Sequence, residues 1–87
     1  MRVTDAQKIS EVIHQVAKQD GVKVGVAKAR FAGEANYSVP SLERLMRGEA
    51  ASEDVLKSTL EAVRKRRLKF REDDLFPLAP TSKGRTS

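Results

Sequence analysis

Residues 31–48 read FAGEANYSVPSLERLMRG, and the expected arrangement of the whole chain is built outward from this segment. The apolar and alanine residues before Asn36 predict the end of one helix, because asparagine tolerates the left-handed backbone that ends a helix. Ser38 is expected to cap a second helix, with Pro40 in its first turn, where the missing N–H costs little. Gly48 is expected to end that helix. The segment therefore predicts two helices joined by about three residues.

The second helix, expected over residues 39–47, has two different faces. Its apolar stripe consists of Leu42, Leu45 and Met46. A short opposite face that ends in two arginines has the size and charge to enter a DNA major groove. This opposite face is formed by Val39, Ser41, Glu43, Arg44 and Arg47.

A helix is predicted ahead of this pair, over residues 5–19. Apolar residues recur there at helical spacing: Ile9, Val12, Ile13, Val16 and Ala17. Thr4 or Asp5 is expected to cap it, and Asp20-Gly21 is expected to end it. Residues 22–25 alternate valine with other residues but are expected to form a loop, since a lone strand would lack a partner. The next helix is then predicted over residues 26–35.

A fourth helix is predicted after the pair, with Ser52 as its N-cap and acidic residues in its first turn. Its inward residues are expected to be Val55, Leu56, Thr59, Leu60 and Val63. Residues 64–67 are expected to form its last turn, where cations are favoured.

The chain has 87 residues, a length that indicates one domain, expected over residues 1–77, followed by a flexible tail over residues 78–87. The sequence has no cysteine, which excludes disulfides and thiolate chemistry. There is no apolar run long enough to span a membrane and no apolar signal region near the N-terminus. A cytoplasmic protein without membrane contact is therefore expected.

The net charge of +5 is concentrated at one place in the sequence. Residues 1–63 hold nine basic and nine acidic residues, whereas residues 64–71 hold six basic residues and no acidic one. Such a block attracts phosphate regardless of nucleotide sequence. The alternative interpretation is that it caps the fourth helix and forms a solvated face.

The order of these pieces resembles the Cro/lambda-repressor-like (Xre-type) family of helix-turn-helix DNA-binding proteins. Phe31-Ala32 corresponds to the family's Leu-Ala pair, Asn36 to its turn glycine, and Arg47-Gly48 to the end of its recognition helix. Asp73-Asp74-Leu75-Phe76 corresponds to its C-terminal ending, so the resemblance covers roughly residues 5–77. It implies an all-α fold: a compact bundle of four to five short helices that contains a helix-turn-helix.

The resemblance also implies which residues meet DNA. The positions that face base edges are Val39, Pro40, Ser41 and Arg44. Arg44 is the main candidate for sequence reading, because arginine pairs bidentately with guanine. The candidate phosphate contacts are Lys28, Ser38 and Arg47, together with Arg64 and Lys65 of the basic block. Two departures from the family are Glu49-Ala50-Ala51, where relatives often carry cations, and Pro40, which removes one N–H.

The function implied is that of a transcriptional repressor, of the kind found in phages and plasmids, which binds an inverted-repeat operator as a dimer. Apolar residues left over near the C-terminus are candidates for the homodimer contact: Leu68, Phe70, Leu75 and Phe76. The alternative is an antitoxin or adaptor, a protein-interaction module that holds its partner through residues 68–78.

An enzyme is not expected, because catalysis needs converging titratable groups, a nucleophile with its base, or metal ligands. The chain has one histidine, His14, and its carboxylates are dispersed along the sequence. No catalytic residue, metal site or cofactor is therefore predicted. RNA binding is not favoured either, because Tyr37 and the three phenylalanines do not form an aromatic platform for bases.

Overall fold

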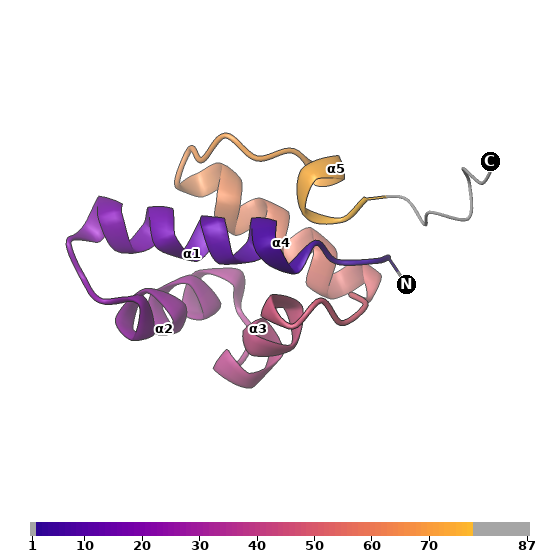
Figure 1. Ribbon diagram of the computed structural model, residues 1–87, viewed down its shortest axis with the longest axis horizontal. Helices are drawn as coiled ribbons and strands as arrows, with labels where there is room; N and C mark the ends of the chain where they lie inside the picture. Colours follow the sequence, from indigo (N-terminus) through magenta and orange to yellow (C-terminus); the bar gives the residue numbers. More distant parts are fainter. Residues whose placement is uncertain (1, 78–87) are drawn as a thin grey trace.

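The computed structural model describes residues 2–77, which form a compact all-α globule (Figure 1). Within these residues the five helices are α1 (Ala6–Asp20), α2 (Val24–Ala35), α3 (Val39–Met46), α4 (Glu53–Lys65) and α5 (Glu72–Leu75). The β pairing found among them is one isolated antiparallel bridge between Arg2 and Ala51. The predicted all-α class is confirmed, while the tail expected over residues 78–87 lies outside the described residues.

α1 begins and ends where local chemistry predicts. The Asp5 carboxylate accepts a hydrogen bond from the Lys8 backbone N–H at 3.1 Å, so Asp5 rather than Thr4 is the N-cap. Gly21 follows the last turn with φ +64°, and its N–H donates to the Ala17 carbonyl. Glycine adopts this left-handed conformation without steric cost, which explains why the helix stops there.

Two helix boundaries differ from the prediction. α2 begins at Val24, two residues before the predicted start, and Val24 is half-buried against the core. The segment 22–25, which was expected to form a loop, therefore belongs partly to a helix. α4 ends at Lys65, because Arg66 caps it and Arg67 takes the left-handed conformation, with φ +57°. Neither glycine nor asparagine marks this end, so no residue type there predicts it.

The core contains side chains from all five helices. α1 packs against α2, α3 and α5, and α2 packs also against α3 and α4. In Figure 1, α1 crosses the front of the molecule, with α2 and α3 on one side of it and α5 on the other. The largest fully buried side chains are those of Phe31 and Phe76. Burial of this apolar surface is the main force that holds the short helices together.

Leu75 and Phe76 were expected to be available for a dimer contact, and the structure corrects this expectation. Both side chains are 0% exposed and belong to the core, because α5 packs them against the rest of the bundle. Leu68 and Phe70 are half-buried and pack partly against the same core. Residues 68–76 therefore offer a dimer or a protein partner much less apolar surface than their sequence suggests, while Leu78 of the predicted partner-binding segment 68–78 lies outside the described residues.

The N-terminal residues join two parts of the chain that are distant in sequence. Arg2 and Ala51 exchange two backbone hydrogen bonds, of 3.0 and 2.9 Å, and the Asp5 N–H donates to the Leu75 carbonyl at 2.8 Å. The Arg2 guanidinium also binds the Glu72 carboxylate at 2.9 Å and the Phe76 carbonyl. Residues 2–5 thus connect the loop before α4 with α5.

Candidate nucleic-acid interface

The connection between α2 and α3 is short and well defined. It consists of three residues, of which Asn36 adopts the left-handed conformation, with φ +64°. The Tyr37 N–H donates to the Ala32 carbonyl at 3.0 Å, which closes the end of α2. Ser38 caps α3 by accepting a hydrogen bond from the Ser41 N–H at 3.3 Å. The predicted turn chemistry at Asn36 and Ser38 is confirmed.

Tyr37 anchors this connection to α4. Its hydroxyl lies 2.9 Å from the Thr59 hydroxyl, which itself donates to the Val55 carbonyl at 2.8 Å. Because the Thr59 proton is used there, the Tyr37 hydroxyl donates to the Thr59 oxygen. Burial raises the pKa of Tyr37 to about 12. Sequence analysis missed this contact, because no local signal links two hydroxyls 22 residues apart.

α3 presents the expected division between a buried and an exposed face. Leu42 and Leu45 are almost completely buried, which confirms the predicted apolar stripe. Among the four predicted base contacts, Pro40 and Arg44 are exposed, and Ser41 is half-buried with its hydroxyl 3.0 Å from that of Ser38. The fourth, Val39, packs partly against the core.

Arg44 stands apart from the other cations of this region. Its side chain is exposed and forms no ion pair with any residue of the described segment 2–77. It borders a groove of about 180 Å³ between α3 and the start of α4. The groove is lined by Ser41, Arg44, Leu45, Ala50, Ala51, Ser52 and Val55. Arg44 is therefore the guanidinium of α3 that is free to bind another molecule.

Two predicted phosphate contacts already lie beside carboxylates. The Lys28 ammonium is 3.6 Å from the Glu43 carboxylate. The Arg47 guanidinium contacts one Glu49 oxygen through Nε at 3.2 Å and through Nη2 at 3.1 Å. Phosphate binding at Lys28 or Arg47 would thus compete with an internal carboxylate. Both Arg47 and Glu49 are more than half exposed, so water weakens this ion pair.

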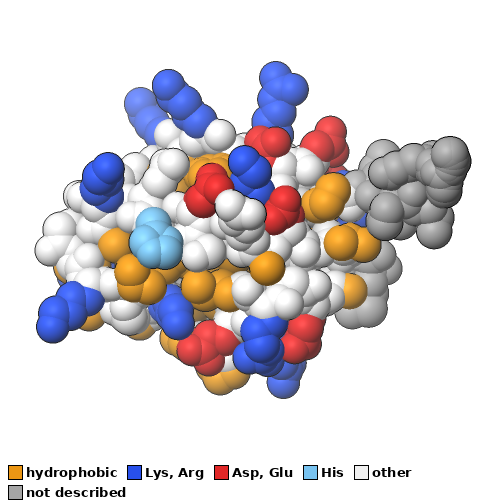
Figure 2. All heavy atoms as spheres, in the orientation of Figure 1, with side chains coloured by type: hydrophobic (Ala, Val, Ile, Leu, Met, Phe, Trp, Pro, Cys, Tyr) orange, Lys and Arg blue, Asp and Glu red, His pale blue; other side chains and the backbone are white. Residues whose placement is uncertain are grey.

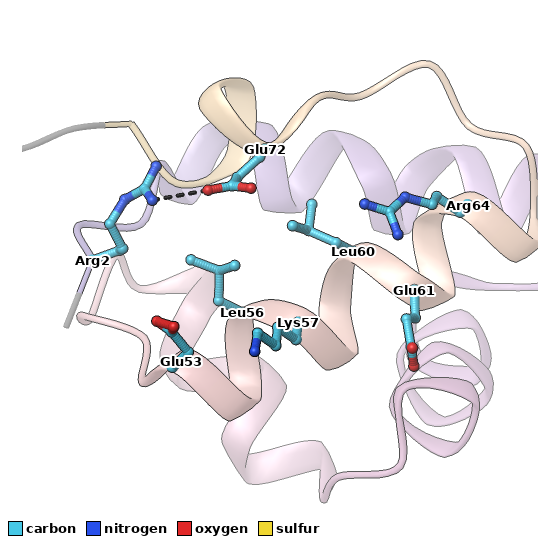
Figure 3. A pocket seen from close by; sticks show the side chains of 8 residues that line it. All are labelled: Arg2, Glu53, Leu56, Lys57, Leu60, Glu61, Arg64 and Glu72. Atoms are coloured by element: carbon cyan, nitrogen blue, oxygen red, sulfur yellow. Dashed lines mark hydrogen bonds and ion pairs between the residues drawn. The ribbon is translucent and has the colours of Figure 1, made fainter.

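Arg64 lies on a different surface from Arg44. It lines a groove of about 500 Å³ beside α4, together with Arg2 and with Glu72 of α5, and none of the lining residues comes from α3 (Figure 3). Val55, which faces α3, and Arg64 are separated by about two and a half helical turns, so they leave opposite sides of α4. The structure does not bring the predicted contacts Arg64 and Arg44 together.

Lys65 is exposed in the last turn of α4. It lies ten residues beyond Val55, a separation of about 15 Å along the helix axis. Lys65 therefore flanks the α3 region at a distance. Figure 2 agrees with this dispersed arrangement, because on the face it shows, cationic side chains project at separate places with acidic ones among them.

Arg66, in the middle of the basic block, has a structural role that the sequence did not indicate. Its guanidinium makes two hydrogen bonds to Glu34, both of 2.6 Å, and two to Asp20, of 3.0 and 3.1 Å. The hydrogen bond from Arg66, with a second one from Arg30, holds the pKa of Asp20 below its usual range. Arg66 thereby joins the C-terminal ends of α1, α2 and α4 and is not available for phosphate.

Among the described residues, no three His, Cys, Asp or Glu side chains gather where they could hold a metal ion. None of the helices within residues 2–77 combines the length and apolar composition that a membrane-crossing helix requires. Comparison with family models, with curated proteins and with solved structures gave no match to this chain.

Proposed function

We propose that this chain is a sequence-specific DNA-binding regulator of transcription, a repressor that binds an inverted-repeat operator as a dimer. In this proposal α2 and α3 form a helix-turn-helix, and each copy inserts α3 into the major groove of one half-site. The proposal rests chiefly on one observation. α3 is held to the core by Leu42 and Leu45, while Arg44 on its outer side is exposed and forms no ion pair within residues 2–77.

Side chains of α3 contact base edges, and side chains on and beside α3 contact phosphates. Arg44 donates to O6 and N7 of a guanine, and the neighbouring Pro40 and Ser41 meet base edges near the start of the helix. Lys28, Ser38 and Arg47 contact the flanking phosphates, the two cations after exchanging their carboxylate partners for phosphate. Val39 contributes mainly by holding the start of α3 on the core.

The rigid attachment of α3 favours this proposal. Asn36 and Ser38 fix the direction in which α3 leaves α2, and the hydroxyl contact between Tyr37 and Thr59 ties the connection to α4. A reading element placed on fixed helices is more accurate than one on a loop. The size of the exposed face, less than three helical turns, matches the part of a recognition helix that enters a groove.

Selection of bound duplexes from a random DNA pool tests the proposal directly. The expected result is an inverted repeat whose half-site centres are about one helical turn apart, roughly 34 Å. Recovery of no preferred sequence, even at low ionic strength, would contradict sequence-specific binding. The same selection also measures the symmetry of the site.

Arg44→Ala is the matched point test on the selected site. It is expected to weaken specific binding by about 1–3 kcal/mol and to relax the preference at one base pair. Lys18→Ala removes an exposed cation from α1 and is the control, expected to leave that preference unchanged. Fluorescence anisotropy on the cognate duplex and on a scrambled one distinguishes the two variants. An equal loss on both duplexes would remove the base-reading role from Arg44.

A further inference from the structure

One face of α4 carries four charged side chains that have no ion-pair partner in the described part of the chain. Glu53, Lys57, Glu61 and Arg64 are all exposed, and none of them forms an ion pair with another residue of the described chain. Arg66, by contrast, lies against two carboxylates of its own molecule. These four charges are therefore accessible to another molecule.

These charges lie along the α4 side of a groove whose floor is apolar. Leu56 and Leu60 point into the space between α4 and α5, and they are only 6% and 7% exposed (Figure 3). The opposite wall holds Arg2 and Glu72, which already pair with each other at 2.9 Å. The unpaired charges of the groove therefore all belong to α4, and their two signs balance.

The charges along α4 would match those of a second α4 that runs in the opposite direction. The signs alternate as negative, positive, negative and positive from Glu53 through Lys57 and Glu61 to Arg64. When a second α4 runs antiparallel, Glu53 faces Arg64 of the other copy and Lys57 faces its Glu61. Leu56 then faces Leu60, and all three pairings are centred at the level of residues 58–59. One two-fold axis therefore places each charged side chain of this face opposite a side chain of the other sign.

We propose that this α4 face is the contact between two copies of the chain, packed antiparallel across a two-fold axis. A polyanion such as DNA would attract Lys57 and Arg64 but repel Glu53 and Glu61. A cationic partner would have the opposite conflict, and a parallel copy would place like charges opposite each other. The antiparallel copy is the occupant whose charges match all four positions.

The proposed contact leaves α3 free, because Val55 and Arg64 leave opposite sides of α4 and α3 lies on the Val55 side. It replaces the dimer contact expected from Leu75 and Phe76, which are buried in the core. The inference does not depend on DNA binding, since it rests on α4 alone. The contact is small: Glu53 and Arg64 lie about 16 Å apart along the helix axis. Exposed ion pairs add little each, so the dimer is expected to be weak, in the micromolar range.

Sedimentation equilibrium of the whole chain without DNA tests the contact, at protein concentrations up to about 1 mM. The wild-type chain is expected to dimerise, and more weakly as salt rises. Glu53→Lys places a cation opposite Arg64 at two symmetric sites and is expected to weaken dimerisation about tenfold or more. Adding Arg64→Glu to Glu53→Lys reverses both charges of the pair and is expected to restore dimerisation.

Asp54→Lys is the matched control, because it makes the same charge reversal in the same first turn of α4. Its penalty on the helix dipole is similar, but Asp54 leaves the helix about 100° away from Glu53. If circular dichroism shows that Glu53→Lys unfolds the chain, Lys57→Glu with and without Glu61→Lys repeats the test on the second pair. The proposal is wrong if the wild type stays monomeric, if Asp54→Lys weakens the dimer equally, or if the double reversal restores nothing.

Discussion

The segment 64–76 and helix α3 mix apolar residues with arginines in similar ways, but the structure uses them differently. In segment 64–76 the Arg66 side chain is 12% exposed and binds two carboxylates, and Phe76 is part of the core. In α3 the leucines hold the helix, and Arg44 remains exposed without an ion pair among the described residues. The density of positive charge in a sequence therefore does not identify a binding surface. A cation that already has an internal partner, as Arg66 has, is not available to bind another molecule.

The largest expected effect tests the structural assignment of segment 64–76. Phe76→Ala removes a fully buried aromatic side chain and is expected to lower the free energy of unfolding by about 3–5 kcal/mol. Phe70→Ala, at a half-buried position, is the control with a smaller expected loss. Urea denaturation followed by circular dichroism measures both. If Phe76→Ala were as stable as the wild type, the assignment of Phe76 to the core would be wrong.

The next largest effect is the loss of stability expected when Arg66, a cation with internal partners, is replaced. Arg66→Ala leaves Asp20 and Glu34 without their guanidinium and is expected to lower the free energy of unfolding by about 2 kcal/mol. Lys69→Ala, an exposed neighbour without an ion pair among the described residues, is expected to change it by less than about 0.5 kcal/mol. Thermal and urea unfolding at neutral pH compare the two. If the two variants were equally stable, the Arg66 contacts with Asp20 and Glu34 would contribute no more than a solvated cation does.

A third test uses pH on the contact that fixes the α2–α3 connection. The pKa of Tyr37 is raised from 10.0 to about 12 in the folded chain, so the unfolded chain loses this proton first. The contribution of the protonated Tyr37 hydroxyl to the free energy of unfolding is complete below pH 10. It decreases as the pH rises toward 12, by up to about 2 kcal/mol. Tyr37→Phe has no such proton, so the stability difference between wild type and variant is expected to shrink over this range. A constant difference would mean that Tyr37 titrates normally.

The smallest expected effect is a change in DNA affinity when the ion pair at the end of α3 is removed, and it rests on the proposed DNA binding. Glu49→Gln removes the carboxylate beside Arg47, which frees this guanidinium for phosphate. Binding to random-sequence duplex is expected to become tighter at low salt, with a salt slope steeper by up to about one. Asp73→Asn, which removes a similar carboxylate from α5, is the control. An unchanged slope for Glu49→Gln would show that the ion pair does not compete with phosphate.

Sequence alone predicts the parts of this fold that depend on neighbouring residues. Asp5, Ser38 and Ser52 act as helix caps, and Asn36 ends α2, because each effect needs only the adjacent backbone. The apolar spacing of α1 likewise identifies its buried face. These local signals are sufficient to predict the all-α class and the outline of α3.

The features that the sequence could not predict join residues far apart in the chain. The Arg66 contacts with Asp20 and Glu34 span more than 30 residues, and the Tyr37 contact with Thr59 spans 22. Such pairings depend on how the helices pack, which residue spacing does not specify. The end of α4 was missed for a different reason, because Arg67 adopts a conformation that arginine seldom takes.

The attachment of residues 2–5 has a practical consequence for anyone who produces this protein. Arg2 already pairs through its backbone with Ala51 and through its guanidinium with Glu72. An affinity tag or reporter fused directly ahead of Arg2 would crowd this attachment and strain the loop that precedes α4. A spacer of several glycine and serine residues before Arg2 keeps such a fusion clear of the folded body.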